Sequence, residues 1–475
     1  MTSTLAVTVA GLCLLAALGF LGRRGRTIDL AEWTVGGRNF GGFTMWFLQA
    51  GESFTTFTFL GVAGAAFATG AAATYAILYI PLAFIGQYFF APVLWRLGRR
   101  HGYLTQADFF AERYSSPMFG RIVAVLGLVF LLPYLQLQLT GLGLAVRLVT
   151  GSTSSANLSM VIATVLMVAF VLWSGIRGIA NTAYLKDLLM IGALAVLVIA
   201  VPVHYAGGVG SMFHKIQAHN AQLLTVHSGA YDRTWWLTSV LISTIAAVFL
   251  TSPHHWAPML SARGPRVIRR NAVFLPLYQI AIILPVIVGF AGLLVLSPKT
   301  KSNGVLLTLA DGALPGWATG LIVLAAASSA IVPAAAMCVA LSSLVANNLV
   351  RLRTERAKIL LNHTVVVLAA GVALVLGISR PDLLANLQLL TVSGFAQLIP
   401  AMIAAVGRRR LLSLPAALLG LAAGETLVVW ATLTDTDLAH INAGIAGLAV
   451  NVAVAAVAEL AVRAVARPMI VEESQ

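Results

Sequence analysis

Residues 43–69 read FTMWFLQAGESFTTFTFLGVAGAAFAT, a stretch long enough to cross a bilayer yet polar at its middle. Glu52 is ionisable and lies mid-span, where a charged side chain costs roughly 2.5–3.5 kcal/mol on insertion scales and rarely faces lipid. Gly51 beside it favours an unwound backbone, and the hydroxyls of Ser53, Thr55 and Thr56 can satisfy the backbone groups that unwinding frees. The pattern predicts a broken helix at a mid-membrane binding site. The alternative is a contact between helices made through small residues, with Glu52 bonded to a neighbour.

The composition indicates a membrane protein. Of 475 residues, 59% are hydrophobic and only 10% are charged, and the mean hydropathy is +0.91. Soluble domains hold about 25% charged residues. Apolar runs long enough to cross a bilayer recur along the whole chain. The sequence therefore predicts an all-α polytopic membrane protein that forms one integral membrane domain over residues 1–475.

We expect about thirteen transmembrane helices, each set by the roughly 20 apolar residues that a crossing needs. They are placed at residues 4–22, 43–69, 72–97, 119–149, 156–174, 179–203, 234–255, 271–296, 317–350, 358–378, 384–406, 411–434 and 440–466. In the first of these the arginines follow the apolar run instead of preceding it, which predicts a retained span and not a cleaved signal peptide.

The Lys and Arg residues predict the orientation. The loops after odd-numbered spans, with their margins and the C-terminal tail, hold all but six of the 30 Lys and Arg residues. The six on the other side are Arg147, Lys215, Arg233, Lys299, Lys301 and Arg380. Because positive charge marks cytoplasmic loops, we expect the N-terminus outside and the C-terminus in the cytoplasm. The net charge of +14 then reflects topology and contact with the lipid bilayer, and implies no nucleic-acid partner.

Several function classes are not expected. No GxxxxGK[ST] phosphate-binding motif occurs, so an ATP-driven pump is disfavoured. Three histidines in the longest external loop lack ligand spacing, and Cys13 and Cys338 lie far apart, so no metal site and no disulfide are predicted. What remains is a gradient-driven or passive carrier that is not an enzyme and needs no cofactor.

Several motifs resemble the sodium/solute symporter family. Glu32–Arg38 reads EWTVGGR, like the family's acidic–aromatic entry segment, and the blocks FLGVAG (59–64), LTQADFFAERY (104–114) and SSLVANNLV (342–350) follow in the family's order. Within the family, residues 252–278 and 330–348 resemble the monocarboxylate uptake permeases of bacteria. The similarity spans almost the whole chain.

The resemblance implies a leucine-transporter-like core of two inverted five-helix repeats in the inner (plasma) membrane of a bacterium. Repeat one would cover residues 43–203, and repeat two residues 234–406. Residues 1–42 would hold one preceding helix and a cytoplasmic loop, and residues 407–475 two following helices and a tail.

The span near residues 234–255 is interrupted at the matching repeat position. It ends in Thr251-Ser252-Pro253-His254, where Pro253 removes a backbone donor and tends to end a helix. Two broken helices in corresponding positions point to a binding site between them, so we expect Thr251 and His254 there. The N-terminal ends of the second halves carry partial positive charge, which favours a carboxylate substrate.

Further polar and aromatic residues inside spans are candidates for the same site. Gln388 and Thr391 lie i, i+3 in the span that contributes substrate contacts in the family, although such residues also join helices. Tyr75 and Trp236 are predicted to line the cavity, with a place in the aromatic belt at the span ends as the alternative.

The family's sodium site is altered in this sequence. Family members that use sodium hold it with backbone carbonyls at the first broken helix and with a Ser/Thr hydroxyl pair in the ninth span. The carbonyls fall on Gly51 and Phe54, but the hydroxyl pair falls on Val332 and Pro333. The serines at 328–329 lie one turn away and would replace the pair only if the register slips. Sodium coupling is therefore in doubt.

Two acidic residues are predicted to take part in ion coupling. Glu52 would carry a proton while a carboxylate is bound, which avoids two like charges in one site. Asp187 is expected to face the inner vestibule, as an acidic residue does in the family, and to point away from its neighbour Lys186.

We expect a secondary transporter that takes up small monocarboxylates, such as pyruvate, lactate or short-chain acids, by alternating access. Transport would be coupled to protons or independent of sodium. Three alternatives stay open. One is a sodium-coupled symporter of the same fold for another small solute, such as an amino acid. The others are a solute-sensing membrane domain and a channel.

Overall fold

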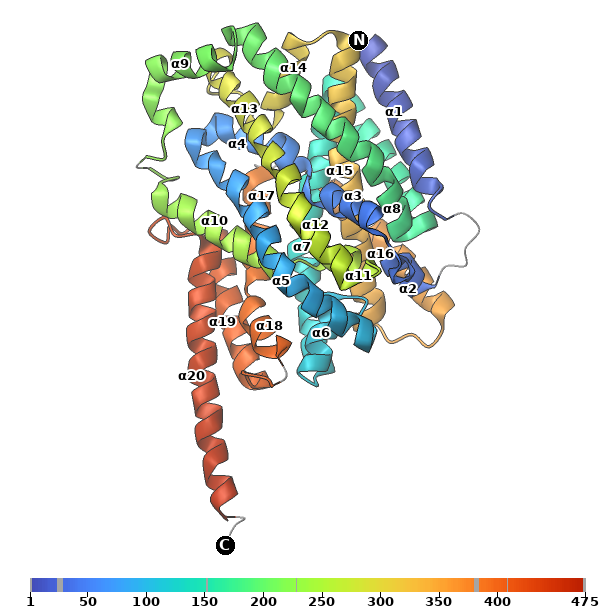
Figure 1. Cartoon of the computed structure of the whole chain (residues 1–475), viewed down its shortest axis with the longest axis vertical. Helices are drawn as coiled ribbons and strands as arrows, with labels where there is room; N and C mark the ends of the chain where they lie inside the picture. The colour runs from blue at the N-terminus through green and yellow to red at the C-terminus, as the bar shows by residue number, and fades with distance from the viewer. Residues whose placement is uncertain are drawn as a thin grey trace.

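A computed structural model describes the chain except residues 1, 24–28, 151–152, 228, 380–383, 408 and 473–475, so Arg380 lies outside the described residues. The described residues form helices and one isolated backbone bridge, with no strand among them. The expected all-α fold is confirmed (Figure 1).

The helices follow the chain in this order: α1 Thr2–Phe20, α2 Leu30–Val35, η1 Gly36–Arg38, α3 Gly42–Ser53, η2 Phe57–Gly61, α4 Val62–Thr69, η3 Gly70–Thr74, α5 Tyr75–His101, α6 Gln106–Arg113, α7 Pro117–Thr150, α8 Thr153–Ala206, α9 Val209–Asn220, η4 Ala221–Leu224, α10 Arg233–Val248, η5 Pro253–His255, α11 Trp256–Ser261, α12 Pro265–Gln279, η6 Ile280–Ile282, α13 Ile283–Val295, η7 Ser302–Gly304, α14 Val305–Ala313, α15 Gly316–Leu344, η8 Val345–Leu349, α16 Glu355–Ser379, α17 Leu384–Ala396, α18 Ile399–Val406, α19 Leu414–Leu433 and α20 Ala443–Glu472.

The number of membrane spans differs from the expected thirteen. Within the described residues, nine helices are long and apolar enough to cross a membrane. Two further spans are possible if α10 with η5 and α11, and α17 with α18, each count as one bent span, which would give eleven. Part of the difference lies in α8, which runs through both expected spans at 156–174 and 179–203. Its backbone leaves the helical region only at Gly175, whose φ of 55° suits glycine. The polytopic membrane fold is confirmed, whereas the count of thirteen is not.

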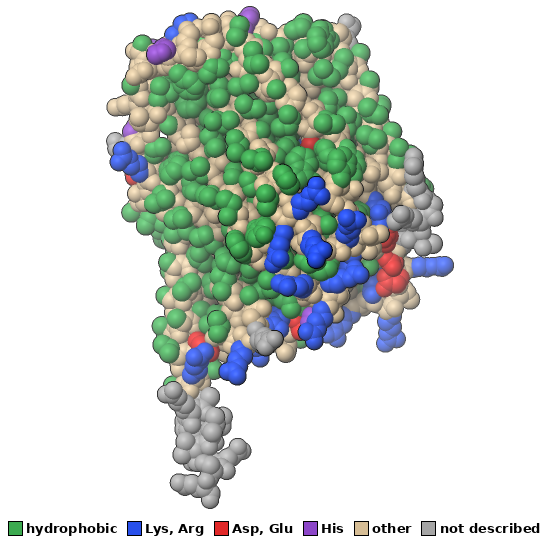
Figure 2. Space-filling model, viewed as in Figure 1, with side chains coloured by type: hydrophobic (Ala, Val, Ile, Leu, Met, Phe, Trp, Pro, Cys, Tyr) green, Lys and Arg blue, Asp and Glu red, His purple; other side chains and the backbone are tan. Residues whose placement is uncertain are grey.

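The surface of the molecule matches a lipid environment. Large apolar side chains are exposed on many helices, among them Phe43, Phe89 and Leu188. Figure 2 shows a broad band of hydrophobic side chains on one face, with most of the visible Lys and Arg near the end away from the start of α1. Such an extended apolar surface would drive a soluble protein to aggregate and is stable only against lipid.

Helix α15 is the central helix of the bundle. It packs against α1, α7 and α8, and its most apolar window is entirely buried inside the protein. Figure 1 shows α15 surrounded by the other helices, while α20 packs along α19 and extends beyond them. A helix that is apolar all round belongs in a core of this kind, because no side of it needs water.

The first broken helix is made of α3, η2 and α4. Helix α3 ends at Ser53, and Phe54 takes an extended conformation (φ −94°, ψ 92°) before the helix resumes at Phe57. The backbone N–H of Thr56 donates to Oε1 of Gln138 (3.1 Å), and that of Phe57 donates to Oγ1 of Thr55 (3.2 Å). Side chains thus satisfy the backbone groups that the break frees, as burial requires.

The second broken helix consists of α10, η5 and α11, with a bend of 40°. Helix α10 ends at Val248, and the helix resumes with Pro253 at its first turn. The carbonyl of Leu250 accepts from the Trp256 indole (2.8 Å), and the carbonyl of Thr251 accepts from the Gln106 amide (2.7 Å). The break predicted at Pro253 is present and is again closed by side chains.

The two broken helices are joined at one end. The N–H of Phe40, two residues before α3, donates to the carbonyl of Ser261 at the end of α11 (2.9 Å). The N–H of Arg263 donates back to the carbonyl of Phe40 (3.0 Å). These two hydrogen bonds make the isolated bridge between Phe40 and Ala262.

Two of the sequence blocks meet at a polar cluster where the span of α15 and η8 ends. Asp108 of α6 accepts from the N–H groups of Leu104 (2.7 Å) and Thr105 (3.0 Å). Its other oxygen accepts from the amides of Asn347 (2.8 Å) and Asn348 (2.6 Å) in η8. Burial raises the pKa of the Asp108 carboxyl, and these hydrogen bonds offset only part of that rise. The carboxylate therefore fastens the loop after α5 to the end of α15.

Candidate functional site

A central cavity lies where the two broken helices face each other. The empty space in it, with the open solvent at its mouth counted in, is about 780 Å³, and its wall is built from α3, α5, α7, α10, η5, α11 and α17. Five of the predicted site residues line it: Glu52, Ser53, His254, Gln388 and Thr391. Segments far apart in the sequence therefore bring their polar side chains to one chamber.

Glu52 is the carboxylate on this wall among the described residues. It is only 3% exposed, and its Oε1 has no hydrogen-bond partner in the described structure. Unpaired buried carboxyl atoms are costly and rare, so this atom requires an explanation. Its partner therefore has to come from the cavity, as water, a solute or a proton.

The cavity wall also carries two adjacent histidines. The rings of His254 and His255 lie 4.1 Å apart between centroids, and His254 also contacts the ring of Tyr134 (5.4 Å). The Nδ1 atoms of both histidines have no partner among the described residues. These rings and the Tyr134 phenol give the cavity groups that can take part in hydrogen bonds.

Helix α17 contributes an amide and a hydroxyl. Gln388 Oε1 has no partner in the described residues, whereas the Thr391 hydroxyl donates to the carbonyl of Leu387 one turn earlier (2.9 Å). Gln388 therefore presents hydrogen-bonding capacity to the chamber, and Thr391 presents mainly an acceptor oxygen.

Six other predicted site residues do not line the cavity. Thr55, Thr56 and Thr251 hold the backbone at the two breaks, as described above. Gly51 directs its carbonyl toward α8. Tyr75 packs on Trp235 (5.3 Å), and Trp236 donates its indole N–H to Thr74 Oγ1 (3.0 Å), so both lie at the α5–α10 contact. A substrate role for these residues stays a prediction.

The partial positive charge expected at the first break is already engaged. The N–H groups of Thr55, Thr56 and Phe57 donate to Thr58 Oγ1, Gln138 Oε1 and Thr55 Oγ1 respectively. A solute carboxylate in the cavity would therefore depend on side-chain donors at this end.

The prediction that Lys186 and Asp187 point apart is wrong. The Lys186 ammonium donates to Asp187 Oδ1 at 3.0 Å, because its flexible four-carbon stem lets the nitrogen reach beside its own neighbour. It also donates to the carbonyls of Gly51 (2.9 Å) and Phe54 (2.5 Å) at the first break. Asp187 is buried and also accepts from the Tyr278 hydroxyl (3.1 Å). It therefore faces protein and not an open vestibule.

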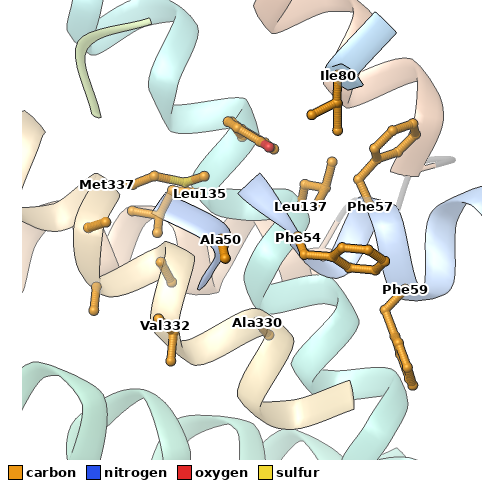
Figure 3. Packing of buried hydrophobic residues seen from close by; sticks show 14 of the residues in the cluster. Ala50, Phe54, Phe57, Phe59, Ile80, Leu135, Leu137, Ala330, Val332 and Met337 are labelled. Carbon is orange, nitrogen blue, oxygen red and sulfur yellow. The ribbon is translucent and has the colours of Figure 1, made fainter. Parts of the chain in front are cut away.

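Helix α15, which packs against α3, is apolar at the two positions that the resemblance assigns to the hydroxyl pair. Val332 and Pro333 of α15 are buried, and Figure 3 shows Val332 on the helix that passes beside Ala50 and Phe54. The hydroxyls of Ser328 and Ser329 donate to carbonyls of their own helix, those of Ala325 (2.9 Å) and Ala326 (2.7 Å).

Sequence reasoning missed several contributors to the cavity, and it missed the ammonium at the break. Among the polar ones, Gln49, Tyr79, Tyr134, Ser243 and Ser252 line the cavity without having been predicted. A signal was present for Tyr134, since it follows Pro133 inside a span and a polar ring there rarely faces lipid. For Lys186, a buried lysine mid-span was itself the signal.

Two broken helices around a buried chamber in a helical membrane protein define the class of secondary transporters. Residues 33–421 match the model of the Sodium:solute symporter family, and the chain belongs to that family. It is therefore a membrane transporter and not an enzyme.

Two bacterial proteins are similar to this chain over most of its length. A Bacillus subtilis protein named "Uncharacterized symporter YhjB" is 31% identical over 471 residues, covering 96% of each chain. A Rhizobium johnstonii protein named "Monocarboxylate transport permease protein" is 27% identical over 416 residues, covering 84% of this chain and 83% of that protein.

The fold has a solved counterpart. The structure of a Na⁺-coupled sialic acid symporter, described as substrate-bound and outward-open, aligns with a TM-score of 0.78 at 15% identity. The alignment covers 96% of this chain and 97% of that one. The leucine-transporter-like fold is thereby confirmed.

Proposed function

We propose that this transporter takes up small monocarboxylates, such as pyruvate, lactate or short-chain acids, by alternating access, with a proton as the coupling ion in place of sodium. The observation that carries the proposal is Glu52, a buried carboxyl on the cavity wall whose Oε1 lacks a partner among the described residues. The solute would contact Glu52, Ser53, His254, Gln388 and Thr391.

The chemistry of the wall links the solute to a proton. A protonated Glu52 donates a hydrogen bond to a carboxylate, and the pair then carries one negative charge instead of two. The described lining of the cavity contains no Lys or Arg to balance a second negative charge. Binding of the acid anion therefore favours the proton on Glu52, and by reciprocity the proton favours the anion. The name of the Rhizobium johnstonii relative, a monocarboxylate transport permease protein, supports monocarboxylates as the solute class.

A second candidate follows from the same residue. An ionised Glu52 would pair with the ammonium of an amino acid, as in a symporter for that solute class. The two candidates predict opposite protonation of Glu52 with solute bound. Accumulation of labelled alanine in preference to lactate would favour the second.

Uptake into proteoliposomes tests the proposal. With an inward proton gradient the parent should concentrate labelled lactate, and initial rates in sodium and choline buffers should agree within about twofold, a difference of ~0.4 kcal/mol. Glu52→Gln should keep lactate exchange but lose pH-driven accumulation. The matched control is Glu355→Gln, since Glu355 is exposed and pairs with Lys358 (2.7 Å).

Three outcomes would contradict the proposal. Accumulation by Glu52→Gln equal to the parent would remove Glu52 as the coupling group. A tenfold stimulation by sodium would show that sodium drives uptake. No saturable accumulation without a partner chain would favour a solute sensor.

The orientation in the membrane belongs to the same proposal. We place the protein in the bacterial inner membrane with the N-terminus outside and the C-terminus in the cytoplasm, as the asymmetry of Lys and Arg suggests. A cysteine introduced at Ser3 should react with an impermeant thiol reagent in intact cells. Labelling only after lysis would show that the N-terminus lies in the cytoplasm, the opposite of the proposed orientation.

A further inference from the structure

The ammonium of Lys186 is completely enclosed and completely bonded. Its side chain is 0% exposed, and its three N–H donors meet three acceptors: the carbonyls of Gly51 (2.9 Å) and Phe54 (2.5 Å) and Oδ1 of Asp187 (3.0 Å). A lysine ammonium has three donors and no acceptor, so this set uses its full capacity. Asp187 supplies the balancing charge and is held in turn by the Tyr278 hydroxyl.

The two carbonyls are the ones that the family resemblance assigns to sodium. They come from the last turn of α3 and from the extended residue after it, where the helix is interrupted. The approach of α8 to this point is close: a Cβ added to Gly51 would lie 2.9 Å from Cβ of Ala183 and 3.5 Å from Oδ2 of Asp187. Helix α8 is thus fitted against the break at the level of Lys186.

The oxygen atoms at this break do not suit a sodium ion. A hard cation needs several oxygen ligands, by analogy with calcium and magnesium. Both carbonyl oxygens already accept from the ammonium, and the two positions that the resemblance assigns to the hydroxyl ligands hold the apolar, buried Val332 and Pro333 of α15. A second positive charge between the same two oxygens would lie within a few Å of the first in a buried site, which is strongly unfavourable.

We propose that the Lys186 ammonium is a built-in cation that takes the place of the coupling sodium and holds the break of α3 against α8. Lys186 is thus a positioning residue, which acts through the backbone of Gly51 and Phe54. Because it is tethered to α8, this cation cannot leave with the solute and draws no energy from a sodium gradient. The inference extends the sodium independence in the proposed function, but it does not depend on which solute is carried.

Thermal unfolding of the purified protein tests this without any solute. In the parent, exchanging sodium chloride for choline chloride at constant ionic strength should shift Tm by less than about 1 °C, because there is no sodium site to fill. Lys186→Ala should lower Tm by about 3 °C or more, because Asp187 is left as an unpaired buried charge.

Rescue of the Lys186→Ala variant by added amines then distinguishes a role of the ammonium from a role of side-chain packing alone. Propylammonium supplies the three carbons and the nitrogen that Lys186→Ala removes, so it should restore most of the lost Tm. Tetramethylammonium, which has the charge but no N–H donors, should not. The matched control is Lys358→Ala on the surface of α16, which should keep the parent Tm and show no response to propylammonium.

Two results would overturn the inference. One is a rise of several degrees in the Tm of the parent protein with sodium but not with choline. This measurement needs no variant, so it is decisive even if Lys186→Ala fails to fold. The other is a Lys186→Ala protein as stable as Lys358→Ala. Failure of lactate uptake alone would leave both measurements unaffected and would count only against the proposed solute.

Discussion

The Asp108 cluster allows a quantitative prediction for one substitution, Asp108→Asn. Each carboxylate oxygen accepts two hydrogen bonds, one oxygen from Leu104 and Thr105 and the other from Asn347 and Asn348. An amide nitrogen cannot accept, so with Asn347 and Asn348 oriented as they are the substitution orphans two donors, whichever way its own amide is turned. At about 1–3 kcal/mol for each orphaned donor, the loss is about 2–6 kcal/mol.

The lower part of that range is expected. The carboxylate pays a desolvation cost that a neutral amide avoids, and the raised pKa of Asp108 records that cost. We therefore expect a loss of about 2–4 kcal/mol. An unfolding entropy of about 2.1 cal/mol/K per residue gives about 1 kcal/mol/K for 475 residues, so Tm should fall by about 2–4 °C.

The assay is thermal unfolding of the purified protein followed by tryptophan fluorescence. Asp311→Asn is the matched control, because Asp311 is exposed on α14 and the same change there should leave Tm within about 1 °C. If Asp108→Asn proves as stable as Asp311→Asn, the cluster does not fasten α6 to η8 and the reasoning fails.

Three further outcomes are expected. Gly51→Ala should lower Tm and slow uptake, because the added methyl group would press on α8. The control Gly192→Ala should do neither, because nothing lies within 4 Å of its added Cβ. Equal behaviour of the two variants would contradict the close approach of α8 to Gly51. The hydrogen bond to Asp232 raises the pKa of His440, so the stabilising contribution of this pair should be present below about pH 6.5 and be lost as pH rises through the higher folded-state pKa. A His440→Gln variant whose Tm deficit is unchanged between pH 5.5 and 8.5 would refute this. Lactate should compete with labelled pyruvate and lactamide should not, since the amide lacks the charge that a protonated Glu52 binds; equal competition would contradict the proposed solute class.

Both helix breaks were predictable because local chemistry causes them. Gly51 beside an ionisable residue, and Pro253 without an N–H, each disfavour a continuous helix whatever packs around them. Their backbone partners were less predictable. Gln138 and Gln106 close the breaks from helices distant in the sequence, and no periodicity in one segment identifies its partner in another.

The ammonium at the first break shows why spacing alone is insufficient. Neighbouring residues diverge at the Cα atoms of a helix, and on that ground Lys186 and Asp187 were expected to separate. A long, flexible side chain need not follow its Cα–Cβ direction to its end. Tyr75 and Trp236 illustrate the converse, since residue type suggested a cavity wall and helix packing placed both at the α5–α10 contact.

The backbone bridge between Phe40 and Ala262 has a consequence for motion. It joins the segment entering one broken helix to the segment leaving the other, through backbone hydrogen bonds whose N–H donors only a proline at Phe40 or Arg263 would remove. While the bridge holds, a displacement of the segment before α3 is transmitted to the segment after α11 through these two hydrogen bonds. The two broken helices are therefore coupled mechanically outside the chamber as well as across it.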